Sequence, residues 1–320
     1  MGDKTSIEWT RGDDGTPGAT WNPIVGCSKV SPGCDNCYAV GTVHRGLAEQ
    51  HRGLTVRAEG ATDWTGEVRV VESMMDRPLR WTKPRRIFVN SLSDLFHPDV
   101  SDETIARIFA VMALAPQHTF QVLTKRPQRM ADMLSTRLFW KVVASHCADD
   151  QTASLSWPYR TAVANHQGLP NVWLGVSIES DRYAFRADHL RRTPAAVRWI
   201  SAEPLLGPLP SLDLTGIDWL VVGGESGPKA RPMHPQWVRD LRDECTDICC
   251  PECGETWPYD DAEIPCSHCR GSGAEDPTAF LFKQGGSVLA KEWGCTDSKG
   301  GKLDEIPAEF QIREYPGGTS

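Results

Sequence analysis

The sequence predicts an α/β protein built on a full or partial (β/α) barrel, similar to a TIM barrel. Short apolar runs recur along the chain and alternate with segments of helical periodicity. The runs are rich in Val, Ile, Phe and Trp and apolar on both faces, which is typical of parallel strands covered by helices. Chemically capable polar residues follow almost every run, as in barrels whose sites lie at the C-terminal ends of the strands. A doubly wound open sheet is the alternative, and it would gather such residues at one switch point.

About seven strands are expected. They are 20–26, 87–92, 119–124, 172–177, 197–201, 217–224 and 279–284. The polar residues that follow them are Cys27, Asn90, Ser91, Ser93, Asp94, Lys125, Arg126, Ser177, Glu179, Ser201, Glu203, Glu225, Ser226, Lys283 and Gln284.

The clearest helix between these strands is 101–116. Ser101 is a suitable N-cap, two acidic residues follow it in the first turn, and Pro116 ends the pattern. Its apolar face has the i, i+3, i+4, i+7 spacing of Ile105, Ile108, Phe109 and Met112. Further helices are expected at 180–193 and 234–245.

Two segments interrupt this alternation. Residues 135–170 show little periodicity and are interpreted as an insertion that is a candidate lid. Residues 246–277 contain a dense group of cysteines and are interpreted as a zinc-ribbon-like insertion. The expected organisation is therefore a single barrel domain over residues 1–320 that carries two insertions.

Composition limits the classes of function. The chain has 320 residues, 40% of them apolar, and a net charge of −8, so it lacks the overall positive charge of many nucleic-acid-binding proteins. A local basic rim is an open alternative, formed by Arg85, Arg86, Lys125, Arg126 and Arg129. A polar N-terminus and the absence of a long apolar run predict a cytoplasmic protein, where eleven cysteines favour metal binding over disulfides.

The first cysteine group, Cys27, Cys34 and Cys37, has the spacing C-x6-C-x2-C. Four thiolates complete a tetrahedral zinc site, whereas three hold a [4Fe-4S] cluster and leave one iron open to a small molecule. The group follows the first predicted strand, at the face where barrels carry their sites. An iron-sulfur cluster is therefore favoured, with a zinc site completed by a remote ligand such as His44 as the alternative.

The second cysteine group has the spacing C-x2-C-x12-C-x2-C and consists of Cys250, Cys253, Cys266 and Cys269. Two CxxC pairs at this distance are typical of zinc ribbons, in which four thiolates bind one structural zinc ion. Structural zinc is favoured here over a second iron-sulfur cluster. A metal suits this segment because so short an insertion cannot form a sufficient core alone.

The chain resembles a known family in several blocks that occur in family order and span nearly all of it. They are 7–10, 21–39, 90–97, 115–127, 172–177, 201–208, 219–245 and 282–286. These blocks look like the phage Gp37/Gp68 family (DUF5131), a domain of otherwise unknown function that is regarded as similar to radical S-adenosylmethionine (radical SAM) enzymes. The resemblance implies an enzyme in which the open iron binds S-adenosylmethionine and electron transfer yields a 5′-deoxyadenosyl radical. It also implies an electron donor and, from neighbouring genes, a three-Cys-motif partner protein.

The chain departs from the common radical SAM pattern in one respect. The usual spacing is C-x3-C-x2-C, and the first interval here is longer by three residues. The second half of the motif, from Cys34 to Cys37 and the aromatic Tyr38, is kept. The cysteine group therefore predicts a cluster more strongly than it predicts the radical reaction.

If S-adenosylmethionine binds, its groups need partners at the strand ends. Ser91, Ser93 and Asp94 are candidates for its amino group, with helix capping before Ser101 as the alternative. Lys125 or Arg126 suits its carboxylate. Candidates for its ribose are Ser177, Glu179, Ser201 and Glu203, and Gly223, Gly224 and Glu225 resemble a glycine-rich cofactor loop. His97, His118 and His234 lie at element boundaries and are expected to cap helices or lie at the surface.

Two functions from different classes follow. The favoured one is a radical SAM-type enzyme that acts on nucleic acid or a nucleotide, for modification or repair. The alternative is a non-catalytic, zinc-stabilised nucleic-acid-binding protein. Catalytic residues, substrate and oligomeric state are not written in the sequence.

Overall fold

The computed structural model describes residues 4–12, 15–46, 48–58, 60–149, 157–246, 248–249, 256–257 and 278–316. The chain divides into two compact units. Unit 1 comprises Met1–Ser177 and Asp188–Ala196, and unit 2 comprises Ile178–Ala187 and Val197–Ser320. No helix in these described ranges is long and apolar enough to cross a membrane.

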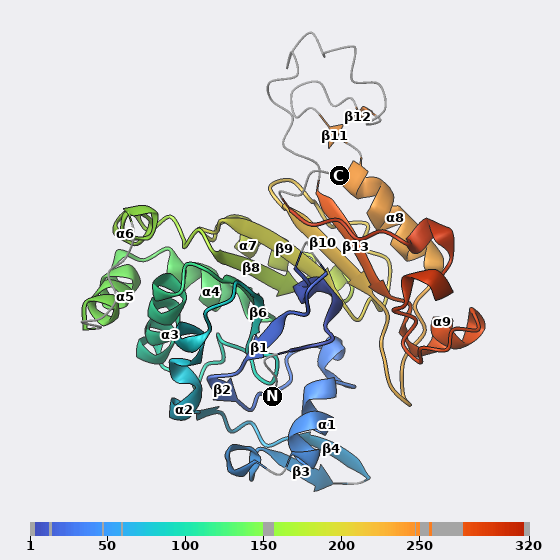
Figure 1. Cartoon of the computed structure of the whole chain (residues 1–320). Helices are drawn as coiled ribbons and strands as arrows, with labels where there is room; N and C mark the ends of the chain where they lie inside the picture. Colours follow the sequence, from blue (N-terminus) through green and yellow to red (C-terminus); the bar gives the residue numbers. More distant parts are fainter. Residues whose placement is uncertain are drawn as a thin grey trace. The chain divides into compact units, whose positions relative to one another are not determined.

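The main sheet has the hydrogen-bonded strand order β1-β6-β7-β8-β9-β10-β13 (Figure 1). The strand pairs described within it are parallel. The order follows the sequence without the reversal that marks a doubly wound sheet, and it ends at β1 and β13. The predicted α/β class is confirmed, and the strand order is that of a partial (β/α) barrel.

Unit 1 contributes four of these strands. They are β1 (Ala19–Trp21), β6 (Arg86–Val89), β7 (Thr119–Thr124) and β8 (Val172–Ser177). In register, Trp21 lies beside Val89, Val89 beside Val122, and Val122 beside Leu174. All four side chains are buried, as expected for parallel strands covered on both faces.

Two predicted strands of unit 1 are shorter than expected. The run 20–26 is interrupted after β1, where Pro23 has no N–H for a sheet ladder. Its second part, β2 (Ile24–Val25), pairs antiparallel with β5 (Arg69–Val70). The run 87–92 ends as a strand at Val89, because Asn90 takes a left-handed backbone conformation with φ of 60°.

Four helices accompany the strands of unit 1. They are α3 (Asp102–Leu114), α4 (Pro127–Leu134), α5 (Arg137–Asp149) and α6 (Trp157–Asn165). The predicted cap of α3 is confirmed, since the Thr104 N–H donates to Ser101 Oγ at 3.1 Å. Helices α3 and α5 lie side by side (Figure 1), and Phe109 packs edge-on against Phe139 and Trp140.

The segment 135–170, expected as an insertion with little periodicity, therefore contains two helices. Within it, Trp140 is 1% exposed, so α5 contributes to the core of unit 1. The proposed role of this segment as a lid stays a prediction.

A small antiparallel substructure of unit 1 follows the first strands. It consists of α1 (Tyr38–Arg45), β3 (Thr55–Ala58), β4 (Ala61–Trp64) and α2 (Glu72–Met75), together with β2 and β5. Helix α1 contacts the β3–β4 hairpin (Figure 1). A buried cluster around Val25, Val43 and Leu54 holds it together, and the side chain of Cys37 packs against this cluster. Short 3-10 helices in unit 1 are Glu8–Thr10, Pro32–Cys34, Glu49–His51 and Arg77–Arg80.

Unit 2 contributes the strands β9 (Val197–Ala202), β10 (Trp219–Gly223) and β13 (Ala279–Gln284). Its helices are α8 (Pro235–Thr246) and α9 (Gly286–Glu292), with 3-10 helices at Asp181–Tyr183, Leu303–Glu305 and Ala308–Phe310. Helix α7 (Arg186–Arg191) spans a boundary between the two units. A two-residue antiparallel pair joins β11 (Ile248–Cys249) and β12 (Thr256–Trp257).

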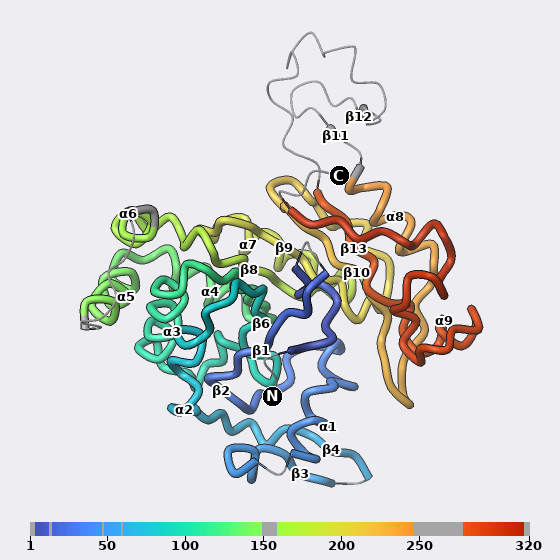
Figure 2. Tube along the Cα trace, in the orientation of Figure 1, coloured from blue at the N-terminus to red at the C-terminus, as the bar shows by residue number. Residues whose placement is uncertain are grey.

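The C-terminal segment of unit 2 runs beside β13 (Figure 2). The Phe282 N–H donates to the Ile312 carbonyl at 3.1 Å, and the Glu314 N–H donates to the Phe280 carbonyl at 3.0 Å. These bonds satisfy β13 on the side away from β10. The rings of Phe282, Trp293 and Phe310 pack against one another in unit 2.

Candidate functional site

The three-cysteine loop of unit 1 runs from Cys27 to Cys37, between β2 and α1. A 3-10 turn shapes its middle, where the Cys34 N–H donates to the Ser31 carbonyl at 2.8 Å. All three cysteines are free and partly exposed. One short loop therefore presents three thiols beside the C-terminal ends of the unit 1 strands.

Gly26 sets the direction in which this loop leaves β2. Its φ is +92°, and a Cβ placed on it would lie 2.2 Å from the Glu67 carbonyl oxygen. Its N–H donates to the Leu92 carbonyl at 3.2 Å. Only glycine meets these conditions without moving the neighbouring strand, so the residue before Cys27 fixes where the first thiol lies.

Asp94 is a buried anchor in the loop that follows β6. Its two carboxylate oxygens accept from Thr124 Oγ1 at 2.7 Å, the Phe96 N–H at 3.0 Å, the Lys125 N–H at 3.1 Å and Arg126 Nη1 at 2.9 Å. Its side chain is only 8% exposed. A carboxylate with this many donors is held in one orientation.

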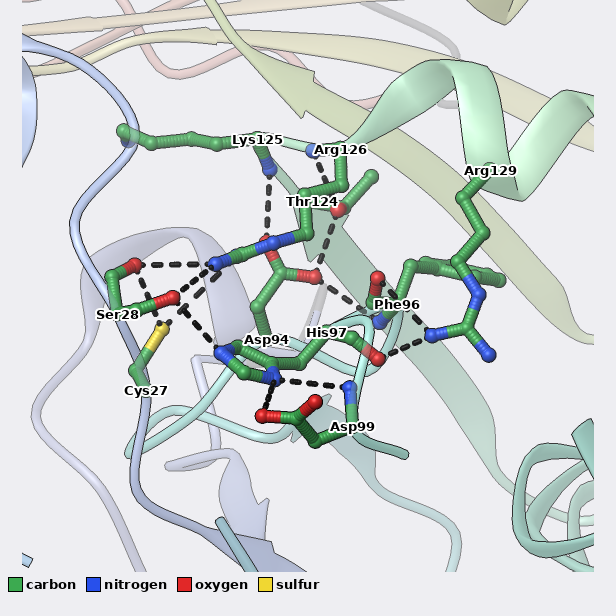
Figure 3. A network of polar contacts seen from close by, with 10 residues as sticks. All are labelled: Cys27, Ser28, Asp94, Phe96, His97, Asp99, Thr124, Lys125, Arg126 and Arg129. Atoms are coloured by element: carbon green, nitrogen blue, oxygen red, sulfur yellow. Dashed lines mark hydrogen bonds and ion pairs between the residues drawn. The ribbon is translucent and has the colours of Figure 1, made fainter. Parts of the chain in front are cut away.

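Arg126 connects Asp94 to the cysteine loop (Figure 3). Besides its ion pair with Asp94, Nη2 donates to the Ser28 carbonyl at 3.0 Å and to Ser28 Oγ at 2.9 Å. Its Nη1 lies 3.9 Å from Cys27 Sγ, within hydrogen-bonding range for sulfur. One planar guanidinium thus binds the start of the cysteine loop on one side and Asp94, in the loop after β6, on the other.

Ser28 and His97 complete the network, and the sequence analysis named neither as a site residue. His97 Nε2 lies 2.8 Å from Ser28 Oγ, and the Asp99 N–H donates to His97 Nδ1 at 3.2 Å. His97 is 3% exposed and the N-cap of the following helix is Ser101, so the expectation that His97 caps a helix or lies at the surface is wrong. The backbone around it is held by Arg129, which donates to the carbonyls of His97 and Val100 (Figure 3).

Of the other two histidines, one is buried in the core and the other caps a helix. His118 is 1% exposed and its Nε2 lies 3.1 Å from the Pro78 carbonyl oxygen, so it is a core residue. His234 is exposed, and its Nδ1 accepts from the Gln236 N–H at 3.2 Å, which confirms helix capping.

The cysteine thiols have strongly perturbed acidity. Burial, together with the negative charge of Asp94, raises the pKa of Cys27 to about 12, and the Arg126 guanidinium opposes this shift. Burial also raises the pKa of Cys37; the backbone N–H of Ala39 and the charge of Lys125 oppose this shift, and the neighbouring Cys34 adds to it. Burial, assisted by Arg126, lowers the pKa of His97. Without a metal the thiols Cys27 and Cys37 are therefore protonated, and metal binding must displace their protons.

Within the described ranges, no three His, Cys, Asp or Glu side chains converge on one metal-ion position. His44, the alternative fourth zinc ligand, instead has its Nδ1 3.1 Å from Thr55 Oγ1. A [4Fe-4S] cluster distributes its thiolates over separate irons, so three thiols spread along one loop are compatible with it.

Two of the remaining candidates of unit 1, Ser91 and Ser93, have hydrogen-bond partners within the unit. Ser91 Oγ donates to Asn22 Oδ1 at 3.2 Å, and Ser93 Oγ donates to the Ile24 carbonyl at 2.9 Å. Ser177 is buried at the end of β8. The Lys125 side chain, which is half-buried, has no hydrogen-bond or ion-pair partner among the residues that the structure describes.

The candidates of unit 2 form three pairs and one cluster. Glu179 pairs with Arg186 at 3.0 Å, and Glu225 accepts from the Arg231 N–H at 2.8 Å and from Arg231 Nε at 2.9 Å. Ser201 uses its carbonyl oxygen to accept from the Ile178 N–H at 2.9 Å.

The cluster lies at the ends of β9, β10 and β13. Glu203 accepts from Lys283 Nζ at 2.6 and 2.8 Å and from Gln284 Nε2 at 3.1 Å, and Gln284 Nε2 also donates to the Gly224 carbonyl at 3.1 Å. A Cβ on Gly224 would lie 2.2 Å from the Gly285 carbonyl oxygen, and one on Gly223 would lie 3.3 Å from the Glu203 carboxylate. Close packing between strand ends therefore accounts for both glycines without a ligand.

The second cysteine group lies outside the described residues, at Cys250, Cys253, Cys266 and Cys269. Its assignment to zinc stays a prediction. Cys245, near the end of α8, is 4% exposed and is a buried residue of that helix.

A family model described as "Protein of unknown function (DUF5131)" matches residues 4–257. The chain belongs to the DUF5131 family. The match covers the three-cysteine loop, Asp94 and Arg126, and it ends before Lys283. No curated protein and no solved structure matches the chain.

Proposed function

We propose that this DUF5131 protein is a radical SAM-like iron-sulfur enzyme whose cluster is bound by Cys27, Cys34 and Cys37. The observation that carries the proposal is the contact between Cys27 and Arg126 at the end of β7, with Asp94 behind it. A loop that only stabilised a fold would not need a buried ion pair to orient one of its thiols. The two raised thiol pKa values add support, because they describe ligands that are unreactive until a metal replaces their protons.

When bound, the cluster would supply an electron to S-adenosylmethionine at its open iron. The chain's own residues prepare the site. Gly26 fixes where the first thiol lies, Asp94 orients Arg126, and Arg126 holds Cys27 and Ser28. The apolar cluster that contacts Cys37 keeps water from that side of the loop.

This geometry changes the roles proposed for three cofactor-binding candidates. Asp94 and Arg126 are engaged with each other, which favours positioning of the loop over direct contact with cofactor. Lys125 has no such partner among the described residues, and its charge acts on Cys37. It is therefore the better candidate for an anionic group of the cofactor. The cofactor-binding roles expected for the unit 2 candidates stay proposals.

We retain a nucleic acid or nucleotide as the proposed substrate class, and an electron donor and a three-Cys-motif protein as proposed partners. The single basic rim expected from the sequence is divided, because Arg85 and Arg86 lie at the start of β6 and Lys125 and Arg126 follow the opposite end of the parallel neighbour β7. Arg85 and Arg77 stack on Trp81, and Arg86 stacks on Trp173, the kind of cation and aromatic combination found in nucleic-acid grooves.

Anaerobic purification and iron-sulfur reconstitution test the proposal. Wild-type protein is expected to be brown and paramagnetic after reduction, with visible absorption that dithionite bleaches, and to convert S-adenosylmethionine to 5′-deoxyadenosine. Cys27→Ala should lose the cluster. Cys295→Ala is the matched control, because Cys295 lies in unit 2 with its thiol against the Glu305 carbonyl at 3.2 Å.

Two outcomes would contradict the proposal. Colourless protein that contains zinc, with Cys27→Ala still folded, would favour the alternative of a non-catalytic zinc-stabilised binding protein. A cluster that forms but never cleaves S-adenosylmethionine would refute the radical reaction and leave only the metal assignment.

A further inference from the structure

Ser28 follows the first cysteine, and its hydroxyl group has two close polar partners. Its hydroxyl oxygen lies 2.8 Å from His97 Nε2 and 2.9 Å from Arg126 Nη2 (Figure 3). These partners come from different loops, 69 and 98 residues further along the chain. The direction of each hydrogen bond decides what the hydroxyl can still do.

Both partners donate to Ser28. A guanidinium has no acceptor, so Arg126 must donate. The Asp99 N–H points at His97 Nδ1 with a distance of 3.2 Å, which makes Nδ1 the acceptor and places the ring proton on Nε2. The His97 Nε2–H is therefore directed at Ser28 Oγ, and both lone pairs of that oxygen are occupied.

The Ser28 hydroxyl proton is then left to be donated. Apart from the contacts with His97 and Arg126, the described hydrogen bonds of Ser28 are those of its carbonyl oxygen, which accepts from Arg126 Nη2 at 3.0 Å and from the Cys27 thiol at 3.5 Å. In the part of the chain that the structure describes, no acceptor for this proton is present. The side chain is half-buried, so a small molecule can reach it.

The two donors also strengthen Ser28 as a donor. A hydroxyl that accepts from a cation and from an imidazole N–H is polarised, and its own proton forms a stronger bond. The charges nearby select the acceptor. Asp94 neutralises Arg126, but the Lys125 ammonium beside Cys37 has no ion-pair partner in the described residues. An anionic group is the complement of this surface.

We propose that Ser28 is a ligand-binding residue, which donates its hydroxyl proton to an anionic oxygen of the molecule bound at the three-cysteine loop. The inference rests on the proposed function for the identity of that molecule. The carboxylate of S-adenosylmethionine and an inorganic phosphate share the chemistry, and separate titrations distinguish them.

The test measures binding by anaerobic calorimetry on cluster-loaded protein. The ligands are S-adenosylmethionine, its decarboxylated analogue and inorganic phosphate, and the variants are Ser28→Ala, Ser28→Thr and Ser31→Ala. Ser31 is a matched control in the same loop, since it is 9% exposed and too buried to contact a ligand.

Ser28→Ala should bind S-adenosylmethionine about 10- to 100-fold more weakly, the usual effect of losing a hydrogen bond to a charged group. Ser28→Thr, which keeps a hydroxyl, should retain most of the affinity, and Ser31→Ala all of it. Affinity for the decarboxylated analogue should not respond to Ser28→Ala.

Unchanged affinity of Ser28→Ala for S-adenosylmethionine would overturn the inference, and so would an equal loss for both ligands, which indicates a structural role. If wild-type protein binds no S-adenosylmethionine, the proposed function fails and the phosphate titration decides. Weaker phosphate binding by Ser28→Ala then supports Ser28 as an anion donor. Equal binding, or none by wild type, refutes it.

Discussion

The replacement of Asp94 by Asn tests whether the buried ion pair organises unit 1. The change keeps the size of the side chain but removes its charge and turns one acceptor oxygen into an NH2 group. Asp94 now accepts four hydrogen bonds, two on each oxygen. Whichever way the amide turns, its nitrogen faces two donors, one of them a backbone N–H.

The magnitude follows from these contacts. Two hydrogen bonds are lost, at about 1 to 2 kcal/mol each. In addition, the Arg126 guanidinium stays buried but no longer has a negative charge beside it. The side chains of Asp94 and Arg126 are 8% and 10% exposed, so solvent screens the pair weakly. Removing one partner of such a pair costs about 3 to 5 kcal/mol, which is the decrease in the free energy of unfolding that we expect for unit 1.

Native-state hydrogen exchange with mass spectrometry is the appropriate assay, because a chain of two compact units need not unfold in one transition. The opening free energy is read from peptides of β6 and β7. Glu72→Gln is the control, since Glu72 forms an ion pair with Arg107 at the surface. The Glu72 side chain is 65% exposed and the Arg107 side chain is 35% exposed. We expect this control to lower the opening free energy by less than about 1 kcal/mol. If Asp94→Asn changes β6 and β7 no more than this control does, the anchoring role of Asp94 is refuted.

Two further predictions concern proton binding. Burial lowers the pKa of His118 below its usual value, so as the pH falls the unfolded chain takes up a proton before the folded chain does. Unit 1 should therefore lose stability as the pH falls below about 6.5. His118→Gln should make the opening free energy of unit 1 depend less on pH. In metal-free protein the raised pKa of Cys27, about 12, should make its alkylation by iodoacetamide at pH 8 about 1,000-fold slower than that of an ordinary thiol. Peptide mass spectrometry measures the rate, and labelling as fast as that of an ordinary thiol would contradict the raised pKa.

Apolar patterning was enough to locate the main sheet. The expected runs 119–124, 172–177 and 279–284 coincide with β7, β8 and β13. A strand buried on both faces is mainly apolar along its length, so the return of polar residues marks where it ends. Where a backbone irregularity ends a strand, as at Asn90, apolar residues continue beyond it and the pattern overruns.

The site was predicted in its parts but not in its connections. Sequence reasoning selected Cys27, Asp94 and Arg126, since each is a polar residue after a buried strand. It could not decide between the adjacent cations Lys125 and Arg126, because only the tertiary fold shows which one turns toward Asp94. The signal for Ser28 was its place directly after the first cysteine, and its partner His97 lies 69 residues away.

The tight fit around Gly26 has a practical consequence for engineering. The cysteine segment 27–37 is aimed by a glycine that is wedged against the Glu67 carbonyl, just before β5. Transplanting those eleven residues into another scaffold would therefore leave the first thiol without a defined direction. The smallest portable module extends from β1 through β5 and includes the segment from β6 to Asp94, so the motif is better regarded as a composite of two chain segments than as a linear signature.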